Sequence, residues 1–161
     1  MYQAYPGGAQ MPEQRAPVPN SILTAVKLMY AGAALDAIGL LIYLVSIGTI
    51  RTAIRKADPS WSTSRVHTAV VAFVGLEVIL ALIGIGLWLW MAWANKGGRS
   101  WARIVALVLF GLSTLFLLLS VAQLHAALGL LLELLGWLVG MGATISLWRK
   151  DSSAYYQASR S

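Results

Sequence analysis

The sequence predicts an all-α fold: a polytopic membrane protein with an antiparallel bundle of four transmembrane helices, preceded by a disordered N-terminal tail. Of its 161 residues, 58% are apolar and only 11% are charged, whereas about 25% charged residues is usual for a soluble domain. The apolar residues form runs that approach or exceed the roughly 20 residues needed to cross a bilayer. Most of the charged residues and prolines lie between these runs or outside them.

Residues 1–20 contain four of the five prolines and no apolar run. Such composition is typical of disordered segments, and we expect a cytoplasmic tail here. Its length, prolines and near neutrality are not typical of a signal peptide. At this chain length we expect one domain, residues 21–150, followed by a short polar cytoplasmic tail, residues 151–161.

The first transmembrane helix is predicted at about 21–50, because Asn20 or Ser21 can cap it. The polar connection 51–67 contains a turn at Asp58–Pro59–Ser60. The first half of this connection can continue the helix beyond the membrane, and Ser62 or Ser64 can cap the next one.

The second helix is predicted at about 68–94, ending before the Gly97–Gly98 pair, which is a helix-stop signal. The third, at about 101–122, follows Ser100 as its cap. The fourth is predicted at about 128–148. A single helix over 104–148 would measure about 67 Å at 1.5 Å per residue, twice a bilayer core, so we expect a tight turn near Gln123, His125 and Gly129.

The basic residues favour one orientation. Four crossings place both termini on one side, and eight of the twelve Lys and Arg residues fall there, against four on the other side. The eight are Arg15, Lys27, Lys96, Arg99, Arg103, Arg149, Lys150 and Arg160. The positive-inside rule then predicts a multi-pass protein of the cell membrane with both termini in the cytoplasm. Most of the tryptophans would lie at the membrane interfaces.

Three acidic residues, Asp36, Glu77 and Glu133, lie inside apolar runs. A carboxylate at membrane depth costs several kcal/mol, so it normally faces protein or water and is a candidate functional group. Tyr43 shares a helical stripe with Asp36. Counted from the predicted helix ends, Glu77 and Glu133 lie at one depth and Asp36 at another, so we expect the two glutamates to be able to meet.

Each acid shares its helix face with small residues, at which transmembrane helices approach closely. Ser113 and Ser120 lie together on one face of the third helix and can donate hydrogen bonds to a neighbour. The predicted packing positions are Gly32, Gly39, Gly84, Gly136 and Gly140.

Two interpretations of the acids stay open. In the first, Asp36, Tyr43, Glu77 and Glu133 form a proton or cation relay for transport. In the second, they are interhelical hydrogen-bonding groups or contacts to another membrane protein.

No enzyme motif or metal-ligand spacing is present, and no cofactor is implied. His67 and His125 are interpreted as interface residues. The chain has no cysteine. Its net charge of +6 does not indicate nucleic-acid binding, because the basic residues flank apolar runs instead of forming a stripe with exposed aromatics.

Three segments, AVKLMYAGAALDAIGL, RKADPS and WLWMAWANKGGRSWARI, lie within a stretch, residues 26–148, that resembles the small, uncharacterised four-helix integral membrane proteins common in high-GC Gram-positive bacteria. The resemblance implies no activity and no site residues. The small multidrug-resistance exporters also have four helices and an intramembrane acid, but this chain does not reproduce their single glutamate near the start of the first helix.

From the sequence we therefore expect a non-enzymatic structural or accessory subunit that acts through helix–helix contacts. Its partner is the lipid bilayer, together with another membrane protein or a second copy of the chain. The alternative is a small proton-coupled transporter or exporter that uses the intramembrane acids.

Overall fold

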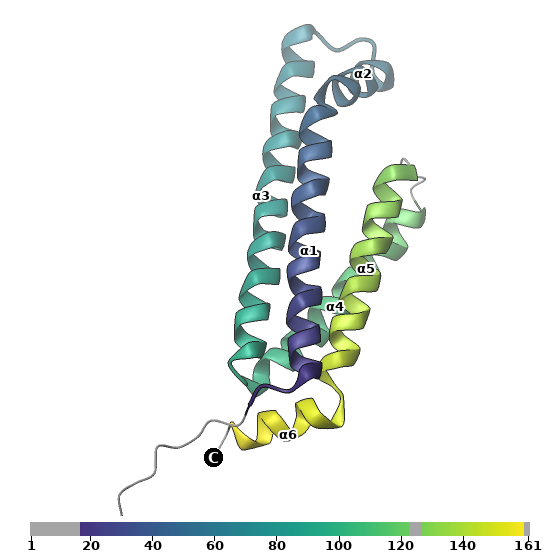
Figure 1. Cartoon of the computed structure of the whole chain (residues 1–161). Helices are drawn as coiled ribbons and strands as arrows, with labels where there is room; N and C mark the ends of the chain where they lie inside the picture. Colours follow the sequence, from purple (N-terminus) through teal and green to yellow (C-terminus); the bar gives the residue numbers. More distant parts are fainter. Residues whose placement is uncertain (1–16, 123–126, 160–161) are drawn as a thin grey trace, which may run out of the picture.

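The computed structural model describes residues 17–122 and 127–159, and all the regular structure among them is α-helical. Four helices are long and apolar enough to cross a membrane: α1 (Asn20–Val45), α3 (Thr63–Lys96), α4 (Ser100–Ala122) and α5 (Ala127–Leu147). Two short helices, α2 (Ile47–Ala57) and α6 (Lys150–Ala158), lie at opposite ends of the bundle (Figure 1). The predicted all-α fold is confirmed, and the chain is a multi-pass membrane protein.

Some predicted features fall on residues that the structure does not describe. These are most of the N-terminal tail, residues 1–16, the turn around Gln123 and His125, and the last two residues.

Helix α1 begins directly after Pro19, whose extended backbone (φ −63°, ψ 151°) stands at the N-cap. The backbone N–H groups of Ile22 and Leu23 donate to the Pro19 carbonyl at 3.0 and 3.1 Å. The helix ends at Val45, and the next residue, Ser46, donates its hydroxyl proton to the Ile42 carbonyl at 2.7 Å. The first helix, predicted to continue to about residue 50, is therefore broken at Ser46.

Helix α2 follows this break, bends away from the axis of α1 and lies beside the first part of α3 (Figure 1). Its isoleucines, Ile47, Ile50 and Ile54, are half-buried, whereas Arg51 and Arg55 are exposed. This separation of apolar and basic faces is typical of helices that lie in the membrane interface. The turn predicted at residues 58–60 is present between α2 and α3.

Helix α3 has 34 residues, or about 51 Å at 1.5 Å per residue, which is longer than the roughly 30 Å hydrocarbon core. It begins at Thr63, about one turn before the predicted start. The Ser62 side chain caps it by accepting a hydrogen bond from the Arg65 N–H at 3.3 Å. Its first turns therefore extend beyond the lipid, beside α2.

Helix α1 is the central helix of the bundle. Helix α1 packs along α3 and along α5, and α4 packs on α5. Figure 1 shows α4 leaving α3 at their shared turn, while α5 leans away from α1 towards the end that carries α2. The α1–α3 pair and the α4–α5 pair are thus close at one end and apart at the other.

The buried core lies at the close end, which carries the start of α1, the α3–α4 turn and the end of α5. Alanines make up much of this core, and their small side chains allow close helix approach. Its fully buried members include Ile22, Ala92, Ala102 and Leu147. Along the rest of the helices, large apolar side chains are exposed, as lipid contact requires.

Candidate functional site

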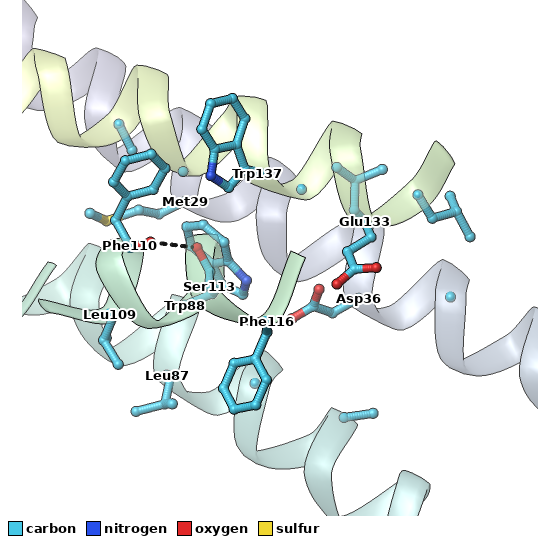
Figure 2. A pocket seen from close by; sticks show the side chains of 18 of the residues that line it. Met29, Asp36, Leu87, Trp88, Leu109, Phe110, Ser113, Phe116, Glu133 and Trp137 are labelled. Carbon is cyan, nitrogen blue, oxygen red and sulfur yellow. Dashed lines mark hydrogen bonds between the residues drawn. The ribbon is translucent and has the colours of Figure 1, made fainter. Parts of the chain in front are cut away.

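The four long helices enclose a cavity of about 810 Å³. It lies where the two helix pairs begin to separate, and all four of these helices contribute to its lining. Apolar and aromatic side chains form most of its wall, including Trp88, Phe110, Phe116 and Trp137 (Figure 2). A cavity of this size and character is typical of sites that bind small molecules.

All three intramembrane acids line this cavity. Asp36 comes from α1, Glu77 from α3 and Glu133 from α5. The sequence placed each acid on a small-residue face, but it did not show that the three faces meet. The tertiary structure brings them to a single site.

Asp36 has two close neighbours on α3. The Trp88 indole, whose only polar group is its N–H, lies near the Asp36 side chain in the cavity wall. A Cβ atom added at Gly84 would lie 3.0 Å from Asp36 Oδ2. Gly84 therefore makes room for the acid of the neighbouring helix, and any larger residue would crowd that carboxyl group.

Glu133 is held from α4, where the Ser120 hydroxyl donates to its Oε1 at 2.9 Å. The sequence predicted that Ser120 and Ser113 could donate to a neighbouring helix. Ser113 instead donates to the Phe110 carbonyl of its own helix at 2.9 Å, although it also lines the cavity.

Glu77 is exposed at the open side of the cavity. Tyr43 on α1 lies near enough to interact electrostatically with it. Tyr43 itself is not part of the cavity lining. It is therefore a neighbour of one acid, whereas the sequence had placed it on the stripe of Asp36.

The sequence predicted that Glu77 and Glu133 could meet, but the structure places Asp36 opposite Glu133 (Figure 2). Figure 2 shows the carboxyl groups of Asp36 and Glu133 turned towards the same part of the cavity. Depths counted along the sequence assume upright helices with the predicted ends. Helix α1 ends earlier than predicted and α5 leans (Figure 1), so the actual levels differ from those counts.

The charges around the cavity have one sign. Among the described residues that line it there are three carboxyl groups and no Lys, Arg or His. The other polar side-chain groups are the hydroxyls of Ser113, Ser120 and Thr144 and the indole N–H groups. A carboxyl group in such surroundings either carries a proton or faces a cation. Within the described ranges, no three acidic, histidine or cysteine side chains are placed to hold a metal ion.

Besides Gly84, two of the predicted packing glycines mark close helix contacts. A Cβ atom at Gly32 would come within 2.6 Å of the Trp88 ring, so this glycine lets the indole lie against α1. At Gly140, it would meet Phe110 at 3.4 Å and Trp88 at 3.6 Å.

At Gly39 and Gly136 the prediction of close packing is wrong. A Cβ atom at either position would meet nothing within 4 Å, and both residues line the cavity. They lie where the helix pairs have begun to separate, so their small size widens the cavity.

Hydrogen bonds and ring contacts fix the α4–α5 wall. The Trp137 indole N–H donates to Thr114 Oγ1 at 2.9 Å, and Thr114 donates to the Phe110 carbonyl at 2.9 Å. The Phe110 and Trp137 rings are 5.5 Å apart, a separation typical of favourable aromatic pairs. This side of the cavity is therefore a defined surface.

Helix α6 closes the opposite, core-containing end (Figure 1). The fully buried Tyr156 donates to Asn95 Oδ1 at 2.7 Å, and Asn95 Nδ2 donates to the Met91 carbonyl at 2.8 Å. Burial raises the pKa of Tyr156 well above its ordinary value. This buried network joins α6 to the end of α3.

A second contact joins α6 to α1 and α5. The Ser152 hydroxyl lies 2.8 Å from the Ser21 hydroxyl and 2.8 Å from the Ser146 carbonyl. One hydroxyl proton serves one acceptor, so Ser21 donates to Ser152 and Ser152 donates to Ser146. Helices α1, α3 and α5 are thus each joined to α6 by hydrogen bonds at this end.

The α3–α4 turn is shaped to receive α6. Gly98 has φ +69°, a conformation that favours glycine. A Cβ atom there would clash with Ser159 and Tyr155 of the α6 segment. Tyr155 also donates to the Lys96 carbonyl at 3.1 Å. Gly98, the second glycine of the predicted helix stop Gly97–Gly98, therefore also makes room for α6.

Sequence reasoning missed α6 because it treated residues 151–161 as a polar tail. Two signals were available: Ser152 and Tyr156 are spaced four apart, on one helical face, and Asn95 is a neutral polar residue at the end of an apolar helix. Neither observation shows, without the fold, that Tyr156 and Asn95 contact each other.

Comparison of the chain with protein-family models, with curated protein sequences and with solved structures finds no match. The resemblance to small four-helix membrane proteins of high-GC Gram-positive bacteria stays a prediction. The cavity and its acids are therefore the features that indicate a function.

Proposed function

We propose that this protein is a small proton-coupled transporter of the cell membrane, in which Asp36, Glu77 and Glu133 exchange protons for a cationic cargo. The observation that carries the proposal is that three acids from three helices line one cavity whose described lining includes no basic side chain. The sequence alone favoured an accessory role because it could not show that the acids share a site.

The chemistry of the wall indicates the cargo. Carboxylates attract a cation, and the faces of Trp88, Phe110, Phe116 and Trp137 provide apolar surface and cation–π contacts. A protonated acid is neutral and a cation-bound acid is compensated, so either state avoids an uncompensated charge at membrane depth. Binding of the cation would release a proton, and protonation would release the cation. The proposal assigns no catalytic chemistry to the chain.

The test is cation-driven proton release from protein reconstituted in liposomes that contain a pH-sensitive dye. Tetraphenylphosphonium is the probe, because it combines a delocalised positive charge with an apolar surface. We expect the wild type to release protons when the probe is added. Asp36→Asn, Glu77→Gln and Glu133→Gln should each reduce the signal towards that of empty liposomes.

The matched control is Asp58→Asn, which removes an acid from the α2–α3 connection, outside the spans. It should leave proton release unchanged. If the wild type releases no protons with this probe or with a panel of other hydrophobic cations, or if all three acid variants release as many as the wild type, the transport proposal is wrong.

The second candidate is the accessory subunit expected from the sequence. The observation that favours it is the separation of the α1–α3 and α4–α5 pairs (Figure 1), which exposes large apolar side chains beside the cavity. A helix of another membrane protein or of a second copy would fill this opening. This role predicts that the acid variants change cross-linking to a partner or thermal stability, while no proton flux occurs in the wild type.

We also propose the orientation in which both termini lie in the cytoplasm. The close end carries Lys96, Arg99, Arg103, Arg149 and Lys150, together with the start of α1. Cytoplasmic loops are enriched in such basic residues. In this orientation the cavity opens towards the outer side, and α6 seals the cytoplasmic side.

A further inference from the structure

Arg103 occupies an unusual position in the first turn of α4. It is half-buried, and its guanidinium carbon lies 5.0 Å from the Trp148 ring centre and 5.6 Å from that of Tyr156. The guanidinium group is therefore held between two aromatic side chains, one at the end of α5 and one in α6.

This arginine lacks an acceptor within the described chain. Its Nε atom is buried without a hydrogen-bond partner, and none of the acids in residues 17–122 and 127–159 forms an ion pair with it. An unsatisfied buried donor costs about 1–3 kcal/mol, and more when the group is charged. The two rings contribute cation–π attraction, but they do not supply an acceptor for the N–H groups.

The surroundings of Arg103 attract an anion. Lys96 and Arg99 are exposed in the preceding turn, and Arg149 is exposed next to Trp148. Arg103 lies in the first turn of a 23-residue helix, where the helix dipole favours negative charge. The acidic residue of this region is Asp151, which is exposed in the first turn of α6.

The depth of the site indicates which anion is available. Exposed tryptophans surround this end: Trp90 and Trp101 are in ring contact at 5.2 Å, and Trp93 and Trp148 are also exposed. Tryptophans of this kind mark the level of the lipid headgroups. The anion present at that level in any membrane is a lipid phosphate.

We infer that Arg103, at the start of α4, binds the phosphate of an anionic phospholipid headgroup. The planar guanidinium group offers two parallel N–H donors, which match two phosphate oxygens. Because Arg103 contacts Tyr156, a bound lipid would also support the docking of α6. The inference is independent of the proposed transport.

The test uses the full chain, purified in detergent, and measures its thermal unfolding midpoint as lipid is added. Dioleoyl phosphatidylglycerol should raise the midpoint with increasing concentration, because a ligand that binds the folded state stabilises it. Dioleoyl phosphatidylcholine has the same acyl chains and no net charge, so it should have a smaller effect. Inorganic phosphate should have none.

Three variants locate the site. Arg103→Gln should lose the difference between the two lipids, and Arg103→Lys should keep part of it, because lysine retains the charge without the two-donor geometry. Arg55→Gln removes an exposed charge from α2, at the opposite end, and should behave as the wild type.

An undiminished lipid difference in Arg103→Gln would overturn the inference, as would equal stabilisation of the wild type by both lipids. An equal effect of inorganic phosphate would replace the lipid with a free anion and would also overturn it. If Arg103→Gln does not fold, native mass spectrometry of the wild type in an equal mixture of the two lipids decides. Preferential retention of phosphatidylglycerol supports the site, and equal retention contradicts it.

Discussion

At the scale of single residues, the contact between Tyr156 and Asn95 is the best-defined polar interaction of the molecule. Both side chains are almost completely inaccessible, and their 2.7 Å hydrogen bond joins segments 61 positions apart in the chain. Asn95 would be a costly residue at this depth without a partner, because a buried unpaired polar group loses its hydration. Its presence is explained by α6.

We expect Tyr156→Phe to lower the free energy of unfolding by about 1–3 kcal/mol, the cost of leaving a buried acceptor unsatisfied. The ring packing stays, so the change isolates the hydroxyl. Tyr155→Phe is the matched control: its hydroxyl also bonds to a carbonyl, that of Lys96, but the contact is exposed. Thermal or denaturant unfolding in detergent measures both. A larger loss for Tyr155→Phe would contradict this account.

The same residue predicts an alkaline pH dependence. Burial raises the pKa of Tyr156 above its ordinary value of 10.0, so the folded state keeps the phenolic proton where the unfolded state loses it. The resulting stability is complete below pH 10 and is lost as the pH rises through the raised pKa. Unfolding midpoints of the wild type should therefore fall more steeply above about pH 10 than those of Tyr156→Phe. Parallel curves would contradict the prediction.

Substitutions at two glycines of α1 distinguish a close helix contact, at Gly32, from the open cavity, at Gly39. We expect Gly32→Ala to destabilise the protein by about 1–3 kcal/mol, as overpacking usually does, because its new methyl group would meet the Trp88 ring. Gly39→Ala lies two turns along the same helix, where the space is open. It should be neutral or slightly stabilising, since alanine favours the helix by about 1 kcal/mol. Equal effects in thermal unfolding would contradict this difference.

At the scale of elements, α6 and the bundle stabilise each other at one end. A polar nine-residue helix is too short to be stable alone, so its structure depends on the contacts of Ser152 and Tyr156 with the bundle. In return, it covers the ends of α1, α3 and α5. The fold is thus closed at the α6 end by specific polar contacts and open at the α2 end.

We expect Ser152→Ala to weaken this closure, because it removes the link between Ser21 and the Ser146 carbonyl. Ser153→Ala is the control, since its side chain is less buried and makes neither contact. Hydrogen–deuterium exchange of the α6 amides should be faster in Ser152→Ala than in the control. Unchanged exchange in Ser152→Ala would show that α6 does not depend on this contact.

At the scale of the whole molecule, the testable quantity is orientation. The chain has no cysteine, so single cysteines introduced at exposed positions report which side they face. We expect Ser60→Cys, between α2 and α3, to react with a membrane-impermeant maleimide in intact cells. Ala154→Cys, in α6, should react after the membrane is opened. The reverse pattern would overturn the proposed orientation, and with it the side on which the cavity opens.

Much of the architecture could be predicted from the sequence because the bilayer acts as a simple solvent. A run of apolar residues about 20 long must form a helix that satisfies its own backbone. The ends of such helices were less predictable. The first helix is interrupted at Ser46, which no hydrophobic pattern reveals, and α3 continues beyond the lipid, where apolar periodicity gives no information.

The residues of the candidate site could be predicted from the sequence, but their position around one cavity could not. Asp36, Glu77 and Glu133 are recognisable in the sequence because carboxylates are expensive in lipid. Their common cavity depends on the tilt of α5 and the order of packing around α1, which are set by side chains distant in the chain. For the same reason the close contacts at Gly32 and the open space at Gly39 look alike in the sequence.

The sequence by itself determined that this chain is helical, that four helices are fit to cross a membrane, and that three acids lie among them. Those properties follow from local composition, because lipid imposes the same requirement on each run separately. The tertiary structure alone decided that the acids share one cavity, that α6 seals the opposite end, and that Arg103 Nε has no acceptor among the described residues. These depend on contacts between segments far apart in the chain, whose geometry no local pattern specifies.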